Sequence, residues 1–333
     1  MVDPSTWTRR ARTGATSIDD LLDPARALDL FAGGATIVLQ SLHRWWPAVR
    51  ALCRDLEVEL GHAVQANAYL TPGGATGLAP HHDTHDVFVL QVHGTKDWTV
   101  RRPVTRAPLA RQRSDHAEAA AQPVLFEASL APGDVLYLPR GFVHSASAQR
   151  GVSLHLTVGV LATTAADVLR RLVDRATDDA RFRRTLTPGW PGDAALAAAE
   201  VAGVVADLRR WLDDVDPTAV ADELGQRFWA ARNPLLGGHL AELAGLAALD
   251  DTTEVRLRPS SPILRDADDG RLVVTLGERR IDLPPALAPA LDRLLDGSTR
   301  PVGDLADLLD AGSRLVLVRR LVREGVLVTV PGG

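Results

Sequence analysis

Apolar and polar residues alternate along several short segments in the first half of the chain. Alternation with a period of two is typical of strands that bury one face. It predicts strands at residues 64–70, 81–92, 96–101, 124–130, 134–138 and 152–160. Glycine and proline lie between these segments, as tight turns between strands require. Many short strands with regular turns favour a double-stranded β-helix, which is one kind of jelly roll.

A second pattern, with apolar residues three or four positions apart, predicts helices on both sides of these strands. On the N-terminal side it covers residues 18–31 and 47–60, whereas residues 35–40 are predicted to form a buried strand. The helix at 47–60 is expected to turn Val49, Leu52, Leu56 and Leu60 toward the core. On the C-terminal side, alanine- and leucine-rich helices are expected at residues 165–176, 194–212 and 218–231. Their apolar faces are larger than a small subdomain needs, which favours dimerisation through residues 162–250, although packing onto the strands explains the same faces equally well.

Residues 251–333 are predicted to form a compact C-terminal module. A hairpin is expected at 271–283, short helices at 286–295, 302–309 and 312–324, and a closing strand at 326–330. This order is similar to that of a winged helix. Residues 261–333 carry ten Arg against eleven Asp and Glu, so the module has no basic footprint, and protein contact is favoured over DNA binding. The predicted chain is therefore α+β with three parts: a catalytic domain at 1–161, a helical dimerisation region at 162–250 and a winged-helix-like domain at 251–333.

Composition narrows the class of protein. Hydrophobic residues make up 46% of the 333 residues and charged residues 24%, as in a globular protein with a substantial core. The net charge of −5 does not support a general binder of nucleic acid or of anionic membranes. Cys53 is the only cysteine, which excludes internal disulfides and a cysteine-ligated zinc site. No apolar run has the length of a signal peptide or a membrane span, so a cytoplasmic location is expected.

Three residues predict a metal site: His81 and Asp83, two positions apart, and His144, far along the chain. Positions i and i+2 of a strand face the same side, so His81 and Asp83 can bind one ion while His82 points away. Two imidazoles and one carboxylate on one side of iron(II) leave positions for a co-substrate and dioxygen. His85 continues the same register and is a weaker candidate, because the ligand set is already complete.

Lys96 is the only lysine in a chain with 37 Lys and Arg, and it follows the strand that begins at His81. A hairpin would bring its ammonium group back toward the metal. There it could pair with the distal carboxylate of a dicarboxylate co-substrate such as 2-oxoglutarate. The alternative is an ordinary surface lysine.

Further polar residues lie on the predicted inner faces of two other strands. Asn67 could hydrogen-bond a chelating co-substrate, and Tyr69 could orient a substrate, although a strand-edge asparagine and a core tyrosine are an equal alternative. On the last strand Ser153, His155 and Thr157 alternate with apolar residues, which favours a polar pocket lining. We expect His155 to lie beside the metal ligands or to face the substrate.

Several motifs together resemble the JmjC-type ribosomal oxygenases of the cupin superfamily. They are Asn67-Ala68-Tyr69-Leu70-Thr71-Pro72, Gly77-Leu78-Ala79-Pro80-His81-His82-Asp83, Asp86-Val87-Phe88-Val89-Leu90-Gln91, and Gly133-Asp134-Val135-Leu136-Tyr137-Leu138-Pro139-Arg140-Gly141 with His144. The family consists of Fe(II)- and 2-oxoglutarate-dependent hydroxylases of arginyl or histidyl residues in ribosomal proteins. The resemblance implies His81, Asp83 and His144 as catalytic iron ligands and Lys96 as the 2-oxoglutarate anchor. It further implies Asn67 near the co-substrate and Tyr69 in the substrate pocket. From the polar face of the last strand, we expect Ser153 and Thr157 near the co-substrate and His155 near the substrate.

The sequence also departs from part of that family. The segment 71–77 has no acidic residue, whereas the bacterial arginyl-hydroxylase branch holds its guanidinium substrate with one. Lysine at position 96 is similar to the histidyl branch. A peptide-tailoring hydroxylase of secondary metabolism, a non-catalytic cupin and winged-helix adaptor, and a cupin enzyme that uses its metal without 2-oxoglutarate stay open as alternatives.

Overall fold

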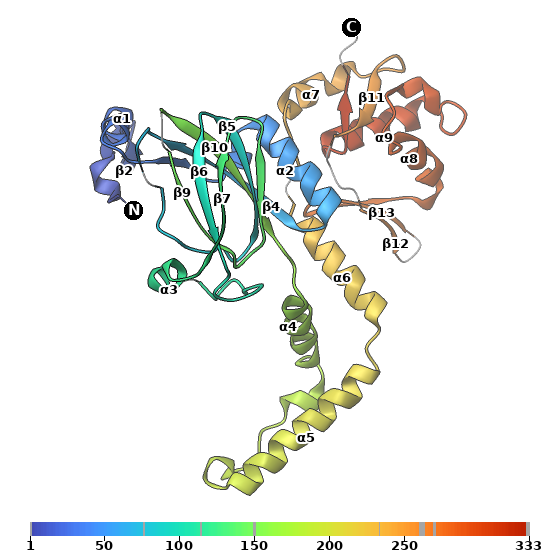
Figure 1. The fold of residues 1–333 in the computed structure, drawn as a ribbon. Coiled ribbons are helices and arrows are strands. Elements are labelled where there is room, and N and C mark those ends of the chain that lie inside the picture. Colours follow the sequence, from blue (N-terminus) through green and yellow to red (C-terminus); the bar gives the residue numbers. More distant parts are fainter. Residues whose placement is uncertain are drawn as a thin grey trace. The chain divides into compact units, whose positions relative to one another are not determined.

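The structure is a computed structural model that describes residues 2–75, 77–113, 115–148, 151–232, 234–259, 264–268 and 271–330. The chain forms two compact units, Met1–Thr163 and Thr164–Gly333 (Figure 1). The first unit contains the predicted strands and the candidate site, and the second contains helices and a small mixed module. The predicted three-part division at residues 161 and 250 stays a prediction.

The first unit is built around two antiparallel sheets, which confirms the predicted jelly roll. The larger sheet has the order β3-β4-β10-β5-β8, and the smaller has the order β7-β6-β9. Neighbours in the sheets come from distant parts of the chain, as in a double-stranded β-helix. Their bounds are β3 Ile37–Leu39, β4 Ala63–Thr71, β5 Asp86–His93, β6 Lys96–Arg101, β7 Val124–Leu130, β8 Val135–Leu138, β9 Val143–Ser147 and β10 Ser153–Leu161.

Helix α2 (Pro47–Leu60) packs on the outer face of the larger sheet. Proline at its first position and Gly61 in the left-handed region at its end set its limits, which match the prediction. Val49 and Cys53 are buried against β4 and β10, and Leu56 packs beside them. The expectation for Leu52 and Leu60 is wrong, because both are exposed on the far side of the helix. The helix contacts the sheet through one face only, so apolar residues outside that face stay exposed to solvent.

The N-terminal segment differs from the prediction. Residues 18–22 lie in a hairpin of β1 (Thr8–Thr13) and β2 (Thr16–Leu22), and only α1 (Pro24–Ala32) is helical. Asp23 separates the two elements, because its carboxylate caps the helix by accepting from the backbone N–H groups of Ala25 and Arg26. The predicted buried strand at 35–40 is the short β3, which is half-buried to exposed.

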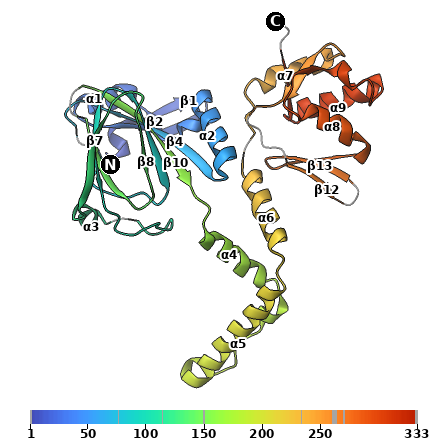
Figure 2. The same ribbon diagram turned by 45° about the vertical axis from the view of Figure 1, so that its right-hand side comes forward.

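In the second unit, helices α4 (Ala165–Ala176), α5 (Ala194–Asp213) and α6 (Pro217–Ala230) lie within one residue of their predicted bounds (Figure 2). Thr164 and Asp167 form a capping box at the start of α4. Large apolar side chains stay exposed on α4 and α5, including Leu169 and Val201 at 63% each. None of the helices that the structure describes is long and apolar enough to cross a bilayer.

The rest of the second unit surrounds its own apolar core. Helices α7 (His239–Gly245), α8 (Ala288–Leu294) and α9 (Ala311–Arg323) accompany two three-stranded sheets, ordered β15-β11-β16 and β12-β13-β14. The strands are β11 Glu254–Leu257, β12 Leu264–Asp268, β13 Arg271–Leu276, β14 Arg279–Leu283, β15 Arg300–Pro301 and β16 Leu327–Thr329. The predicted helix at 302–309 is only a 3-10 turn over Val302–Leu305. The winged-helix assignment stays a prediction.

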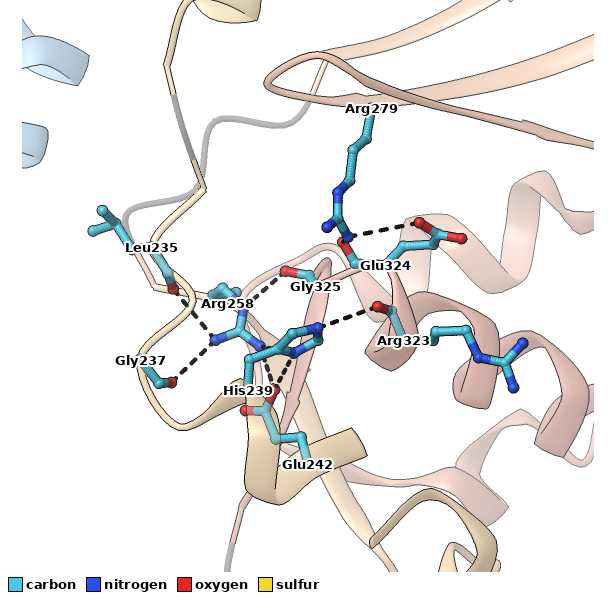
Figure 3. A network of polar contacts seen from close by, with 9 residues as sticks. All are labelled: Leu235, Gly237, His239, Glu242, Arg258, Arg279, Arg323, Glu324 and Gly325. Atoms are coloured by element: carbon cyan, nitrogen blue, oxygen red, sulfur yellow. Dashed lines mark hydrogen bonds and ion pairs between the residues drawn. The ribbon is translucent and has the colours of Figure 1, made fainter. Parts of the chain in front are cut away.

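A buried arginine ties this module together (Figure 3). Arg258 donates to the Glu242 carboxylate on α7, and its Nε donates to the carbonyl of Gly325 at 2.8 Å. His239 lies beside the same carboxylate, with Nδ1 2.9 Å from Glu242 Oε2. Each partner satisfies a group that would otherwise be costly to bury, so the cluster joins α7, the residue after β11 and the turn after α9.

Candidate metal centre

His81, Asp83 and His144 come together in the structure. Their ligand atoms all lie within 4.8 Å of one another, and Asp83 Oδ2 is 3.6 Å from His144 Nε2. His144 belongs to β9, and an isolated antiparallel bridge pairs it with His81: His144 N–H donates to the His81 carbonyl at 2.8 Å and His81 N–H to the His144 carbonyl at 3.2 Å. The pairing of two distant segments therefore places the two imidazoles side by side.

The predicted strand at 81–92 is too long at its start. β5 begins only at Asp86, so His81 and Asp83 do not lie on a regular strand. Asp83 is positioned by its own backbone, since its carbonyl accepts from Gly141 N–H at 3.0 Å in the turn before β9. His82 is buried and turned away from the cluster, with Nε2 3.0 Å from the Gln112 carbonyl. His81 and Asp83 thus lie together and His82 lies apart from them, as predicted, although these three residues do not form a regular strand.

The ring nitrogens are oriented as metal ligands require. Nδ1 of His81 lies 2.8 Å from the Ala79 carbonyl, and Nδ1 of His144 lies 3.1 Å from the Phe142 carbonyl. A carbonyl can only accept, so Nδ1 carries the proton in both rings and Nε2 keeps its lone pair. Burial, together with the closeness of the His81 ring, lowers the pKa of His144 to about 4. Two neutral imidazoles and a carboxylate fit iron(II).

Lys96 lies inside the jelly roll at the start of β6. Its side chain is 3% exposed, which excludes the alternative of an ordinary surface lysine. Nζ donates to Thr71 Oγ1 at 2.9 Å, and burial lowers the pKa of Lys96 to about 8. No carboxylate among the described residues forms an ion pair with it. A buried ammonium with one neutral partner is costly, and an anionic ligand would relieve that cost.

The polar residues of β4 and β10 face one another across the sheet. The antiparallel register pairs Ser153 with Thr71, His155 with Tyr69, and Thr157 with Asn67. Ser153 and His155 are buried, and Ser153 Oγ accepts from Gln91 Nε2 at 2.9 Å. Asn67 Oδ1 accepts from Ser41 N–H at 2.8 Å, so its amide is held by the segment before α2.

Aromatic rings connect the lysine end of this interior with the candidate metal ligands. Tyr69 stacks on His155 with ring centroids 5.0 Å apart, and Trp98 meets the His155 ring edge-on at 5.4 Å. Trp98 also lies 6.0 Å from His144, and His144 lies 4.5 Å from His81. Burial and the Lys96 charge lower the pKa of His155 to about 3, and burial with the Asp83 charge raises the pKa of Tyr69.

Several buried polar atoms here have no hydrogen-bond partner among the described residues. They include His155 Nδ1, Trp98 Nε1 and Gln91 Oε1. Buried polar groups are normally paired, so these atoms are available for hydrogen bonds to a polar ligand. The sequence reading missed Trp98, Thr71 and Gln91. Alternation would have identified two of them, since Trp98 shares a face with Lys96, and Thr71 shares a face with Tyr69.

A cavity of about 660 Å³ opens beside the candidate ligands. Its lining is Leu78, Ala79, His81, His82, Asp83, Thr84, His85, Arg113 and His116. His85 reaches this wall because β10 carries glycine at position 159, where an added Cβ would lie 2.6 Å from the His85 ring. Arg113 and His116 were missed, since they come from a long loop whose position no local pattern encodes.

Comparison with known proteins agrees with this geometry. Residues 44–168 match the model of the JmjC domain. Ribosomal oxygenase 2 of Bos taurus is 31% identical over 241 residues, which are 67% of this chain and 51% of that protein. The bifunctional lysine-specific demethylase and histidyl-hydroxylase NO66 of Dictyostelium discoideum is 31% identical over 247 residues, 67% of this chain and 47% of that protein. The chain thus spans about half the length of these curated relatives.

Solved structures show the same fold. The ribosomal oxygenase YcfD of Escherichia coli, in complex with cobalt and 2-oxoglutarate, aligns with a TM-score of 0.51 and 19% identity. The alignment covers 89% of this chain and 78% of that one. Residues 44–168 therefore form a JmjC domain, and the chain is a JmjC-type relative of the ribosomal oxygenases.

Proposed function

We propose that this protein is an Fe(II)- and 2-oxoglutarate-dependent oxygenase that hydroxylates a side chain of a protein or peptide. The observation that carries the proposal is that one jelly roll contains both a His-Asp-His cluster and a buried lysine that forms no ion pair among the described residues. A metal cupin that does not use 2-oxoglutarate has no need of a buried cation for a distal carboxylate. A non-catalytic adaptor has no need of the cluster.

The residues divide into three roles. His81, Asp83 and His144 hold the metal through Nε2, a carboxylate oxygen and Nε2. Lys96 and Thr71 hold the distal carboxylate of 2-oxoglutarate, and the polar atoms of Asn67, Ser153 and Thr157 complete its site. Tyr69 and His155 lie next to this site, and we assign them to the orientation of the substrate.

Bound iron(II) supplies the oxidising chemistry, in which dioxygen hydroxylates a C–H bond of the substrate while 2-oxoglutarate becomes succinate and carbon dioxide. The chain itself contributes position and polarity. The carbonyls of Ala79 and Phe142 keep both imidazoles in the ligand tautomer. The buried ammonium of Lys96 fixes one end of the co-substrate, so that its other end has a defined place at the metal.

A histidyl residue of a ribosomal protein is the substrate we favour, because NO66 is named a histidyl-hydroxylase and the other relatives are named ribosomal oxygenases. The cavity agrees with a neutral target. Asp83 is the only carboxylate in its lining, and it belongs to the metal cluster, so no acidic group is left to hold a guanidinium. A peptide-tailoring hydroxylase would use the same site.

We assign dimer formation to α4 and α5. Their exposed apolar residues include Leu169, Val173, Val201 and Val205. Within each helix the two residues lie four positions apart and share one face, and an exposed apolar face favours an interface.

The direct test supplies purified protein with Fe(II), 2-oxoglutarate and a cell lysate. Mass spectrometry of the lysate proteins should find +16 shifts, and succinate should form in step with them. The Asp83→Ala variant is the matched negative control. Metal binding without any consumption of 2-oxoglutarate would favour the cupin enzyme that does not use it.

A further inference from the structure

One surface at the candidate site has an unusual charge. The loop of residues 102–122, between β6 and β7, carries four arginines against only Asp115 and Glu118, in a chain whose net charge is −5. Arg102, Arg106, Arg111 and Arg113 are exposed, and none of their guanidinium groups has a hydrogen-bond or ion-pair partner among the described residues. Elsewhere arginines pair with carboxylates, for example Arg171 with Glu223 and Arg314 with Asp251.

The loop is held against the segment that carries the candidate metal ligands. Its Gln112 carbonyl lies 3.0 Å from Nε2 of the buried His82, and its His116 Nδ1 lies 3.1 Å from the Pro80 carbonyl. Gly141, before β9, has φ +91 and packs so closely that an added Cβ would lie 2.3 Å from the Thr105 carbonyl. These contacts on both sides keep the loop in a defined position at the cavity.

Neither nearby carboxylate, Asp115 or Glu118, forms an ion pair with these arginines among the described residues. Asp115 is committed to α3 (His116–Ala120), where Oδ1 accepts from the backbone N–H groups of Ala117 and Glu118. Arg113 thus presents a guanidinium that has no partner in the described part of the chain, and it lies in the same cavity lining as His81 and Asp83. A guanidinium pairs with a carboxylate through two parallel hydrogen bonds, which gives direction as well as attraction.

We propose that Arg113, supported by the other arginines of this loop, recognises an acidic side chain of the substrate peptide close to the residue that is hydroxylated. The inference rests on the proposed function and names a feature of its substrate. An extended peptide advances about 3.4 Å per residue, so a residue on the wall of this cavity reads a position within about three residues of the target.

A peptide fits this surface better than single-stranded RNA. Binding of unpaired bases combines cations with aromatic platforms on which the bases stack. Residues 102–122 contain no Phe, Tyr or Trp, and the only aromatic rings in the cavity lining are histidines. Of these, His81 is a candidate metal ligand, and His82 and His116 lie within hydrogen-bond distance of backbone carbonyls. Cations with so few large stacking surfaces suit a carboxylate.

The test measures binding of fluorescent ten-residue peptides with a central histidine and either Asp or Lys at one flanking position. The full chain is loaded with Zn(II), which has no redox chemistry, and with 2-oxoglutarate, so that binding is separated from turnover. An exposed pair contributes up to about 1 kcal/mol, so we expect the best Asp peptide to bind about fivefold more tightly than its Lys counterpart. Arg113→Glu should reverse this preference, and 0.5 M salt should weaken it.

Arg256→Glu is the matched control, because Arg256 is an exposed arginine of β11, away from the proposed dimer helices, with the same charge change and no side-chain partner among the described residues. It should leave the preference intact. Equal binding of Asp and Lys peptides, or an equal effect of the two variants, would overturn the proposal. Tighter binding of a twelve-nucleotide oligouridine, lost in Arg113→Glu, would overturn it in favour of RNA.

The proposed function is judged separately. Consumption of 2-oxoglutarate by the Fe(II) protein in the presence of lysate proteins reports on the metal centre and on Lys96. Its absence would reject the oxygenase, whereas a charge preference in the Zn(II) protein would still support the role of Arg113.

Discussion

Replacing Lys96 with methionine should stabilise the protein and at the same time weaken 2-oxoglutarate binding. The variant keeps the length of the side chain and removes the charge. Burial lowers the pKa of Lys96 from 10.5 to about 8, which corresponds to about 3 kcal/mol for holding the ammonium inside the jelly roll. The lost hydrogen bond to Thr71 offsets about 1 kcal/mol of this. The net gain is about 2 kcal/mol, or a rise in Tm of about 4–8 °C for a unit of this size.

The effect on the co-substrate has the opposite sign. A charge-assisted hydrogen bond contributes about 1.5–3 kcal/mol, so the dissociation constant of 2-oxoglutarate should rise by about 10- to 150-fold. Thermal unfolding with and without 2-oxoglutarate measures both quantities in one experiment. Wild type should show the lower Tm alone and the larger upward shift with ligand.

Lys96→Arg is the control that keeps the charge, and it should retain part of the ligand-induced shift. A Met variant that is less stable than wild type and responds equally to 2-oxoglutarate would refute the reasoning. Lys96 would then be a structural residue that prefers Thr71 to any ligand.

Other predictions follow from the same structure. Alanine at any one of the three candidate ligands should abolish tight Fe(II) binding in metal analysis, whereas His82→Ala should retain the metal; equal losses would show that the ligand set is wrong. Because the depressed pKa of Lys96 lies near 8, its protonated fraction falls above that pH, so 2-oxoglutarate affinity should fall between pH 8 and 9.5 and calorimetry should detect proton uptake on binding; a flat profile in that range would contradict the anchor. Wild type should be a dimer by light scattering at micromolar concentration and the double variant Leu169→Asp, Val201→Asp a monomer, whereas a monomeric wild type would remove the interface. The full chain should not bind duplex DNA in a salt-sensitive way, since its C-terminal module is near neutral, and such binding would argue for a DNA-reading role.

Sequence patterns predicted the bounds of a helix or strand correctly where neighbouring residues determine those bounds. Strand β6 and helix α4 have the predicted bounds, because alternation and a capping box are both written in neighbouring residues. The start of β5 could not be predicted from neighbouring residues. The chain leaves the sheet before Asp86 because His81 pairs with His144, a contact between residues far apart in sequence.

The candidate site likewise contains residues that the sequence identified and residues that it could not. Lys96 stood out as a lone lysine, and its burial agrees with the interior position expected for it. Arg113 could not be identified, because its place on the cavity wall depends on His82 reaching the Gln112 carbonyl. Nothing in the sequence around His82 indicates that its ring contacts the Gln112 carbonyl.

The measurement that tests the central claim most directly is the consumption of 2-oxoglutarate by the Fe(II)-loaded protein in the presence of dioxygen and lysate proteins. We expect one succinate for each hydroxyl added to the substrate, with both signals lost in His144→Ala and strongly reduced in Lys96→Met at limiting 2-oxoglutarate. Tight Fe(II) binding with no succinate formed at saturating 2-oxoglutarate would contradict the assignment of this site as an oxygenase.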